Sequence, residues 1–276
     1  MKRIRQINDR WTEEDVRFLS QFRIKAKVGH MILNIEEDER YFVIRNHYKD
    51  RWDRYSDILH YEYSQKEIEE SEYFILNGCY CCGYPQPDRD FKYKSSSFDS
   101  SKICPGCGCG RIQTNDLRVN KLSKHGFWGF SAWLLDEYFV SKNVYNEVFA
   151  PYGIEKRDVI KAGKKLEDVF QLIIPVIGEP IDLSDRKQEI CTVCGETKYT
   201  MQHFAYPFFP LHNHPLPGIY KTKEYFGSGH EAQHVLIISK DIVNKLLKSK
   251  DLKKEWLIPC RKSSNDIPIA LPLSMI

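Results

Sequence analysis

The sequence predicts an α+β fold in which mixed helices and short strands are held together by cysteine knuckles. Segments with helical periodicity alternate along the chain with short apolar runs typical of strands. A Cys-x-x-Cys-Gly pattern occurs three times, at residues 79–83, 104–108 and 191–195. The chain has 276 residues, of which 42% are hydrophobic and 29% charged, so it can bury a core as one large or two modest domains.

Two capping-box patterns mark helix starts in the first hundred residues. Thr12 is followed by Asp15, and Ser64 by Glu67. In such a pair the two side chains satisfy free N–H groups of the first helical turn reciprocally. The apolar and aromatic run 41–44 favours a strand instead. We therefore expect helices over 12–25 and from 64 toward 74, with a strand over 41–44.

The segment 127–149 is rich in aromatic and apolar side chains, most of which fit helical faces. We expect a pair of core helices here, with Ser141 as the second N-cap and a stop at Pro151-Tyr152-Gly153. Later patterns predict a strand over 169–177, a strand over 234–238, a helix from Ser239 to about Leu247 and a closing strand over 256–259. A soft boundary near residue 120 separates an N-terminal region, 1–120, from an α+β core, 121–276.

Composition and charge limit the class of protein. The formal net charge is +3, and basic and acidic residues interleave without the dense basic stripe of a dedicated DNA-binding domain. No apolar run reaches membrane-spanning length, and Met1 is not followed by the apolar segment of a signal peptide. We therefore expect a cytoplasmic protein with no membrane partner, whose cysteines bind metal rather than form disulfides.

The spacing of the cysteines predicts structural zinc. Two thiols three positions apart, followed by glycine, can be aimed at one ion by a single tight turn. The pairs Cys79/Cys82 and Cys104/Cys107 are separated by 21 residues, which is zinc-ribbon-like spacing for a Cys₄ site. Four thiolates fill the tetrahedron, so the zinc would stabilise the fold and leave no open position for catalysis.

The third pair, Cys191/Cys194, leaves the ligand pairing open. It would complete a Cys₂His₂ site with downstream residues, or it would share an ion with Cys104/Cys107 and leave the first pair without a partner. The candidate metal ligands of the knuckles are Cys79, Cys82, Cys104, Cys107, Cys191 and Cys194, for one or two zinc ions. The downstream candidates are His203, His212, His214 and Cys260.

An enzyme motif also occurs, and we interpret it as incidental. His230-Glu231-Ala232-Gln233-His234 matches the H-E-x-x-H signature of zinc metallopeptidases. That chemistry requires a helix, because only helical i, i+4 geometry brings both imidazoles to one ion. Gly227-Ser228-Gly229 precedes the motif and an apolar β-branched run follows it, which favours a loop leading into a strand. Asp136 and Glu137 are neighbours rather than a converging pair, and we expect both to be solvated.

A zinc ribbon that presents a hairpin to nucleic acid is the alternative function. The residues available for it are Lys92, Lys94, Lys102 and Arg111 for phosphates, and Tyr93 or Phe98 for base stacking.

The motifs Cys104–Gly108 and Cys191–Gly195 resemble the two motifs of the bacterial double-CXXCG proteins. Residues 225–229, 236–239 and 258–259 are similar to the closing segment of that family, so the resemblance covers about residues 100–276. The family was first described as a set of myxobacterial paralogues, and some members are described as immunity proteins against contact-delivered toxins. The long N-terminal extension and the extra knuckle at 79–83 depart from its pattern.

The resemblance implies two things. The metal would be bound by Cys104, Cys107, Cys191 and Cys194, which ties the middle of the chain to its last third. The function would be to bind and neutralise a cognate toxin without catalysis. We therefore expect a zinc-stabilised, non-catalytic interaction protein whose partner is a cognate toxin. Nucleic-acid binding is the alternative function, and a zinc metallopeptidase is the third candidate.

Overall fold

The computed structural model describes residues 1–50, 56–177, 180–181, 183, 186–200, 209–211 and 216–262. The chain forms two compact units. Unit 1 includes Met1–Glu70, and unit 2 includes Ser71–Met201 and Phe208–Ile276. The boundary near residue 120 that the sequence suggested falls inside unit 2. Within the described part of the chain, no helix has the length and apolar character needed to cross a membrane.

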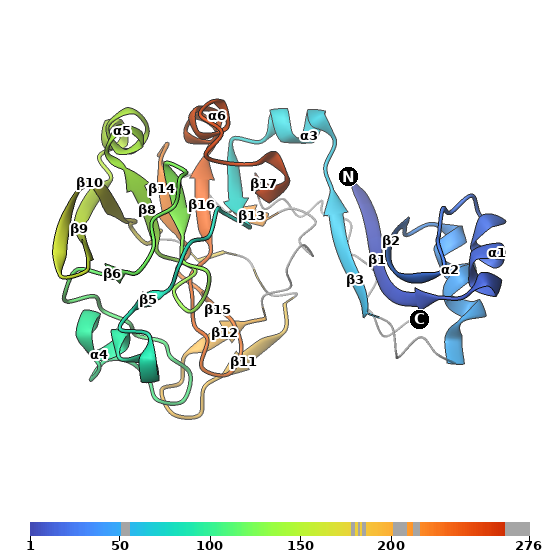
Figure 1. Ribbon diagram of the computed structural model, residues 1–276, viewed down its shortest axis with the longest axis horizontal. Helices are drawn as coiled ribbons and strands as arrows, with labels where there is room; N and C mark the ends of the chain where they lie inside the picture. Colours follow the sequence, from blue (N-terminus) through green and yellow to red (C-terminus); the bar gives the residue numbers. More distant parts are fainter. Residues whose placement is uncertain are drawn as a thin grey trace. The chain divides into compact units, whose positions relative to one another are not determined.

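The described residues of unit 1 form a three-stranded antiparallel sheet with helices α1 (Glu13–Ser20) and α2 (Glu39–His47) packed on one face (Figure 1). Strand order is β2-β1-β3, so the first strand of the chain lies at the centre. The elements are β1 (Lys2–Trp11), α1 (Glu13–Ser20), β2 (Gly29–Glu36), α2 (Glu39–His47), β3 (Ser56–Glu62) and α3 (Gln65–Glu70). Alternate strand residues such as Ile7 and Leu33 are buried against Leu19 of α1 and Tyr41 of α2.

The capping boxes predicted in unit 1 are confirmed. The Thr12 side chain accepts a hydrogen bond from the Asp15 N–H, and the Asp15 carboxylate accepts one from the Thr12 N–H. The same reciprocal pair joins Ser64 and Glu67 ahead of α3. Both helices begin where these local signals place them, because the signals need no tertiary partner.

The strand predicted over 41–44 is wrong, because these residues lie in α2. The Asp38 side chain accepts a hydrogen bond from the Arg40 N–H and begins the helix. Tyr41 and Ile44, three positions apart, are fully buried, whereas Phe42 and Val43 between them are exposed. That is the periodicity of a helix with one face on a core, and a four-residue apolar run is too short to distinguish it from a strand.

The described residues of unit 2 form three sheets, whose strands are labelled in Figure 1. Their strand orders are β5-β6-β9-β10-β8-β7, β13-β17-β4-β16-β14 and β11-β12-β15. The strands are β4 (Tyr73–Leu76), β5 (Pro85–Gln86), β6 (Arg118–Val119), β7 (Phe127–Gly129), β8 (Tyr138–Ser141), β9 (Glu155–Lys161), β10 (Lys164–Ile173), β11 (Gln188–Ile190), β12 (Thr197–Tyr199), β13 (Phe209–Leu211), β14 (Ile219–Lys221), β15 (Tyr225–Phe226), β16 (Leu236–Ser239) and β17 (Leu257–Lys262).

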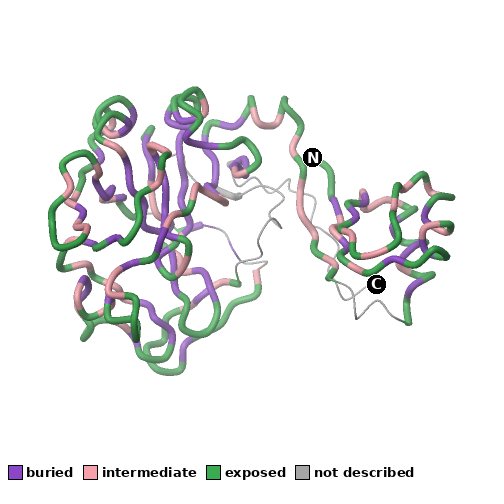
Figure 2. Tube along the Cα trace, viewed as in Figure 1, coloured by how far each residue is buried: buried purple, intermediate pink, exposed green. Residues whose placement is uncertain are grey.

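Helices in unit 2 are short, and α6 is the longest of those described. They are α4 (Tyr93–Ser97), α5 (Lys142–Val144), α6 (Lys240–Lys248) and the single turns η2 (Arg89–Phe91), η3 (Tyr145–Phe149), η4 (Ala150–Tyr152) and η5 (Lys254–Trp256). The buried strands of unit 2 and the buried face of α6 are visible in Figure 2. The structure is thus a mixture of helices and short strands, which is compatible with the predicted α+β class.

The core helix pair predicted over 127–149 is wrong in its first half, where β7 and β8 form an antiparallel pair. Phe127 stacks on Tyr138 and Phe149, whereas the adjacent Trp128 stacks on Phe139. Neighbouring residues therefore pack on opposite faces of the sheet, and both faces are buried. A strand buried on both faces shows no alternation in its sequence, so its periodicity is not informative. Ser141 caps the helical turns that follow, as predicted.

The remaining elements agree more closely with those predicted from the sequence. Strand β10 ends at Ile173, before Pro175, and β16 is followed directly by α6. Ser239 is the N-cap residue of α6, but its hydroxyl accepts a hydrogen bond from the Gly218 N–H instead of capping the helix. The closing strand predicted over 256–259 is observed as β17.

Candidate metal centre

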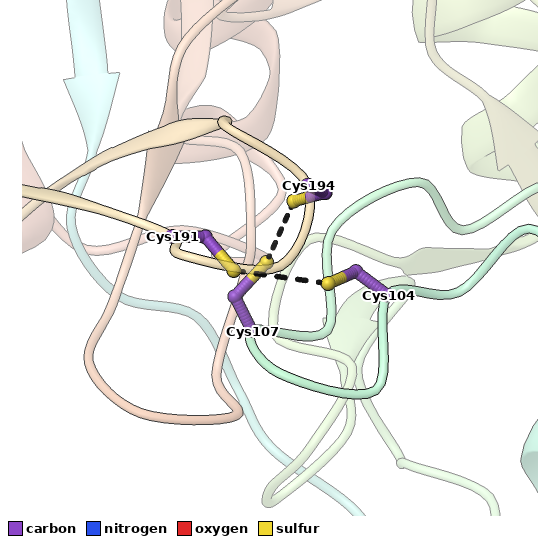
Figure 3. Close-up of side chains that lie close together, drawn as sticks. All are labelled: Cys104, Cys107, Cys191 and Cys194. Atoms are coloured by element: carbon purple, nitrogen blue, oxygen red, sulfur yellow. Dashed lines mark hydrogen bonds between the residues drawn. The ribbon is translucent and has the colours of Figure 1, made fainter.

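Four cysteines of unit 2 form a site that could hold a metal ion. The sulfurs of Cys104, Cys107, Cys191 and Cys194 all lie within 4.8 Å of one another (Figure 3). The Cys104 and Cys191 sulfurs are 3.8 Å apart, and those of Cys107 and Cys194 are 3.5 Å apart. A tetrahedron of sulfurs at about 2.3 Å from zinc has edges of about 3.8 Å. The four thiols therefore fit a tetrahedral Cys₄ site.

Each half of the site is a knuckle with the same backbone hydrogen bonds. In the first knuckle the Gly108 N–H donates to the Cys104 carbonyl, and the Cys104 N–H donates to the Cys109 carbonyl. In the second, Gly195 and Cys191 repeat both bonds with equivalent partners. The two glycines have φ of +77° and +78°, the left-handed conformation that glycine adopts without strain. The glycine of the Cys-x-x-Cys-Gly pattern thus completes the turn in both of these knuckles.

The backbone of each knuckle favours a thiolate at its first cysteine. The N–H groups of Cys194 and Val193 point toward the Cys191 sulfur and lower its pKa to about 6. Desolvation acts to raise the pKa of Cys104, but the N–H groups of Gly106 and Cys107 lower it overall. Thiolates are the ligands that zinc requires, so the knuckles are preorganised for metal.

The second cysteine of each knuckle has a raised pKa instead. Burial, followed by the neighbouring sulfurs, raises the pKa of Cys107 to about 12. Cys194 accepts a hydrogen bond from the Glu196 N–H that lowers its pKa, but desolvation and Cys104 raise it to about 12. Like charges at this separation disfavour one another, so four thiolates need a cation between them. A divalent ion would remove that repulsion.

The two knuckles touch at Gly106 and Val193. A Cβ atom on Gly106 would lie 2.8 Å from Val193 Cγ2 and 3.3 Å from the Cys191 sulfur. No side chain larger than hydrogen fits there without a shift, because real Cβ contacts are longer. The glycine in the first knuckle therefore permits the approach that brings the two pairs of sulfurs together.

The geometry distinguishes between the cysteine pairings that the sequence allows. Of the two pairings that spacing left open, the structure brings together Cys104/Cys107 and Cys191/Cys194. Cys79 and Cys82 belong to no group of three or more close metal-ligating side chains among the residues that the structure describes. The Cys79 sulfur lies 3.5 Å from that of Cys81, and Cys82 packs against a hydrophobic core. Cys260 is buried in β17, and His203, His212 and His214 lie outside the described residues.

The H-E-x-x-H segment forms no helix and covers the metal centre. It is a loop that leads into β16, as the sequence predicted. The His230 carbonyl lies 2.3 Å from where a Cβ on Gly108 would be, so glycine is required at that contact. Ala232 packs in the same cluster as the buried cysteines. The two histidines do not share a helical face, and they join no group of three close ligands in the described chain.

Lys198 is a residue of this centre that sequence analysis missed. It is fully buried in β12, and its ammonium donates hydrogen bonds to the carbonyls of Gly229 and Glu231. Burial raises the pKa of the Cys109 thiol, and the Lys198 charge acts in the opposite direction, so it lies within electrostatic reach of the knuckle. Zn²⁺ with four thiolates carries a net charge of −2, which a buried cation would partly balance. No sequence pattern marks a lysine for this role.

Asp136 and Glu137 are buried, so the expectation that both are solvated is wrong. The Arg111 Nη2 donates to both Asp136 carboxylate oxygens, at 2.7 and 2.8 Å. The Lys221 ammonium donates to Glu137 Oε1 at 2.7 Å and lies 3.9 Å from Asp136 Oδ2. We call these four residues the Asp136 cluster. Its members are far apart in sequence, so only the fold reveals the pairing.

The cluster also bears on the nucleic-acid alternative. Arg111 is engaged with Asp136, and its side chain is largely buried. Tyr93 and Phe98 are only 2% and 4% exposed, so neither ring offers a face to a base. Of the lysines proposed for nucleic acid, Lys92 and Lys102 are exposed and Lys94 is half-buried.

Comparisons with protein-family models, with curated proteins and with solved structures give no match to this chain.

Proposed function

We propose that the protein is a zinc-stabilised, non-catalytic interaction protein that binds and neutralises a cognate bacterial toxin. The observation that carries the non-catalytic part is the Cys₄ geometry of Cys104, Cys107, Cys191 and Cys194. Four sulfurs complete the coordination of zinc, so no position remains for a water or a substrate. Zinc at this centre would fix the two knuckles and the loop that covers them.

An exposed aromatic patch supports the interaction part. We define the aromatic patch as Tyr84, Phe91 and Trp133, which are 42%, 49% and 39% exposed. Their rings lie close together, with centroids 5.2 Å apart for Tyr84–Trp133 and 5.1 Å apart for Phe91–Trp133. Exposed tyrosine and tryptophan side chains are typical of the residues that dominate binding energy at protein interfaces.

The backbone under the patch supports the same interpretation. Phe91 and Trp133 have φ of +53° and +72°, which is unfavourable for residues with bulky side chains. Such conformations cost on the order of 1 kcal/mol each and are concentrated at functional positions. Phe91 and Trp133 of the patch are therefore held in backbone conformations that residues with bulky side chains disfavour.

The specific role as an immunity protein rests on the resemblance of Cys104–Gly108 and Cys191–Gly195 to the double-CXXCG motifs. The test is co-expression with the product of an adjacent gene, because an immunity protein is expected beside its toxin. We expect that product to stop growth alone and to be neutralised by this protein. Replacing Cys104 and Cys107 together with serine should abolish protection, because metal binding and folding are coupled.

Two variants serve as controls for this experiment. The double variant Cys79→Ser/Cys82→Ser should retain protection, because these thiols do not join the Cys₄ group. Glu231→Gln should also retain it, because neutralisation by binding needs no general base. Loss of protection in Glu231→Gln with an unchanged fold would contradict the non-catalytic proposal and favour the metallopeptidase.

A further inference from the structure

A polar pocket of about 200 Å³ lies within unit 2, at the Asp136 cluster. All four members of that cluster line it, together with Arg157 of β9 and residues of β10. Tyr225 and His234, whose rings contact each other at a tilt of 36°, also line the pocket. Tyr225 connects this lining to the candidate metal centre, because its hydroxyl accepts a hydrogen bond from the Gly110 N–H. Sites for drug-sized ligands are about 300–1,000 Å³, so this pocket suits a smaller molecule.

Every oxygen of the two carboxylates in the pocket already accepts a hydrogen bond from the protein. Asp136 Oδ1 accepts from Arg111, and Oδ2 accepts from Arg111 and from the His234 N–H. Glu137 Oε1 accepts from Lys221, and Oε2 accepts from Gln171 Nε2 at 2.8 Å. The protein itself therefore satisfies every carboxylate oxygen that faces the pocket.

The cations of the pocket retain donors. Lys221 makes one hydrogen bond, to Glu137, although an ammonium has three N–H groups. Arg157 has no carboxylate within ion-pair distance in the described chain, and the one hydrogen bond of its guanidinium there is a long contact of 3.5 Å from Nη1 to the Gln113 carbonyl. The Tyr225 hydroxyl accepts from the Gly110 N–H and keeps its own proton for donation.

Charge and hydrogen bonding therefore select the same class of ligand. Three cationic side chains, Arg111, Arg157 and Lys221, face two carboxylates, which leaves a formal charge of +1 on the lining. His234 does not add to it, because burial lowers the pKa of the imidazole, and the opposing effect of Asp136, which raises that pKa, is smaller. A pocket whose cations have unused N–H donors, and whose carboxylates are already hydrogen-bonded within the protein, complements a group that has only acceptors.

We propose that this pocket binds a small oxyanion, the carboxylate or phosphate group of a small molecule, with Arg157 as its principal ligand. The planar guanidinium of Arg157 offers paired donors that match the oxygens of either group. Lys221 and Tyr225 lie in the same lining and provide further donors. The proposal does not depend on the identity of the protein partner.

The test is a thermal-denaturation titration of the zinc-loaded full chain with inorganic phosphate and, separately, with acetate. Sodium chloride at matched ionic strength is the reference. We expect a saturable rise in the melting temperature with at least one oxyanion, because a ligand that binds only the folded state stabilises it. A response to phosphate alone would assign a phosphate group, a response to acetate alone a carboxylate, and equal responses an oxyanion of either kind.

Three variants make the test specific. Arg157→Gln should weaken binding by about 10- to 100-fold, which corresponds to the loss of charge-assisted hydrogen bonds. Arg157→Lys keeps the charge without the paired donors and should bind with intermediate affinity. Arg89→Gln removes an exposed arginine outside the pocket and should bind as the unmodified chain does. The proposal is wrong if neither oxyanion exceeds chloride, or if folded Arg157→Gln responds as the unmodified chain does.

Discussion

The carboxylate of Asp136 depends on two neighbouring cations for its charge. Its side chain is only 1% exposed, and burial alone would raise its pKa. Arg111, followed by Lys221, reverses that effect and holds the pKa well below the ordinary value. The carboxylate is thus ionised at neutral pH, and its removal would leave two buried cations short of a partner.

Replacing Asp136 with asparagine should therefore destabilise the protein strongly. Breaking a buried ion pair by removing one partner costs about 3–5 kcal/mol. Urea unfolding at pH 7 measures this cost. Asp168→Asn is the matched control, because that carboxylate is 85% exposed and 3.9 Å from Lys142, and the expected change is below about 0.5 kcal/mol.

The sign of the pH dependence follows from the lowered pKa of Asp136. Its contribution to stability is complete above the ordinary carboxyl pKa of about 4 and is lost as the pH falls toward the lower pKa of the folded state. The difference between the unmodified chain and Asp136→Asn should therefore shrink below about pH 4. Loss of metal in acid should lower the stability of Asp168→Asn and of Asp136→Asn by the same amount, so the control variant accounts for that effect. A difference that stays constant down to pH 2 would show that Asp136 contributes packing rather than charge.

At the scale of elements, the contact between the two knuckles sets how well the four sulfurs converge. Gly106 in the first knuckle lies against the Val193 side chain of the second. Each knuckle is specified by its own turn, but the distance between them is set by this contact. Steric crowding at one point should therefore change metal affinity without unfolding either turn.

Gly106→Ala should weaken zinc binding, because the added methyl would meet Val193 Cγ2 at 2.8 Å. Overpacking costs about 1–3 kcal/mol, or roughly 5- to 150-fold in affinity. Adding Val193→Ala should restore most of the loss, because it removes the atom that clashes. Competition with a chromogenic chelator measures all three affinities. Without rescue in the double variant, the contact would not be the cause of the loss.

What the sequence predicted correctly was local. The capping pairs Thr12/Asp15 and Ser64/Glu67, and the knuckle turns, depend on hydrogen bonds within a few residues. The choice between the first and third knuckles as partner of Cys104 and Cys107 depends on the path of 87 residues, which spacing does not encode. For the same reason Asp136 was expected in solvent, since its partners Arg111 and Lys221 come from distant segments.

At the scale of the whole molecule, the metal centre belongs to one unit only. All four cysteines lie in unit 2, whereas unit 1 has its own core around Trp11, Leu19 and Tyr41. The stability of the two units should therefore respond differently to metal, because binding energy contributes to the folding of the unit that holds the ion.

Removal of zinc by a chelator should expose unit 2 to proteolysis and spare unit 1. Limited proteolysis followed by mass spectrometry should show rapid cleavage within residues 71–262, with peptides from residues 1–50 persisting. Adding zinc back before the protease should restore resistance in unit 2. Simultaneous cleavage of both units on chelation would contradict their independence, and an unchanged digest would contradict a structural metal.

The place of β4 in its sheet determines the order in which unit 2 can be completed during synthesis. β4 is buried along its whole length and lies between β16 and β17. Leu76 ends β4 and Leu236 begins β16, so 160 residues separate them. At about 5–20 residues per second, a ribosome needs roughly 8–32 s to supply the first neighbour. During that interval the apolar segment Tyr73-Phe74-Ile75-Leu76 has no strand to pair with. We therefore expect chaperones or non-native contacts to bury it until β16 and β17 have been synthesised.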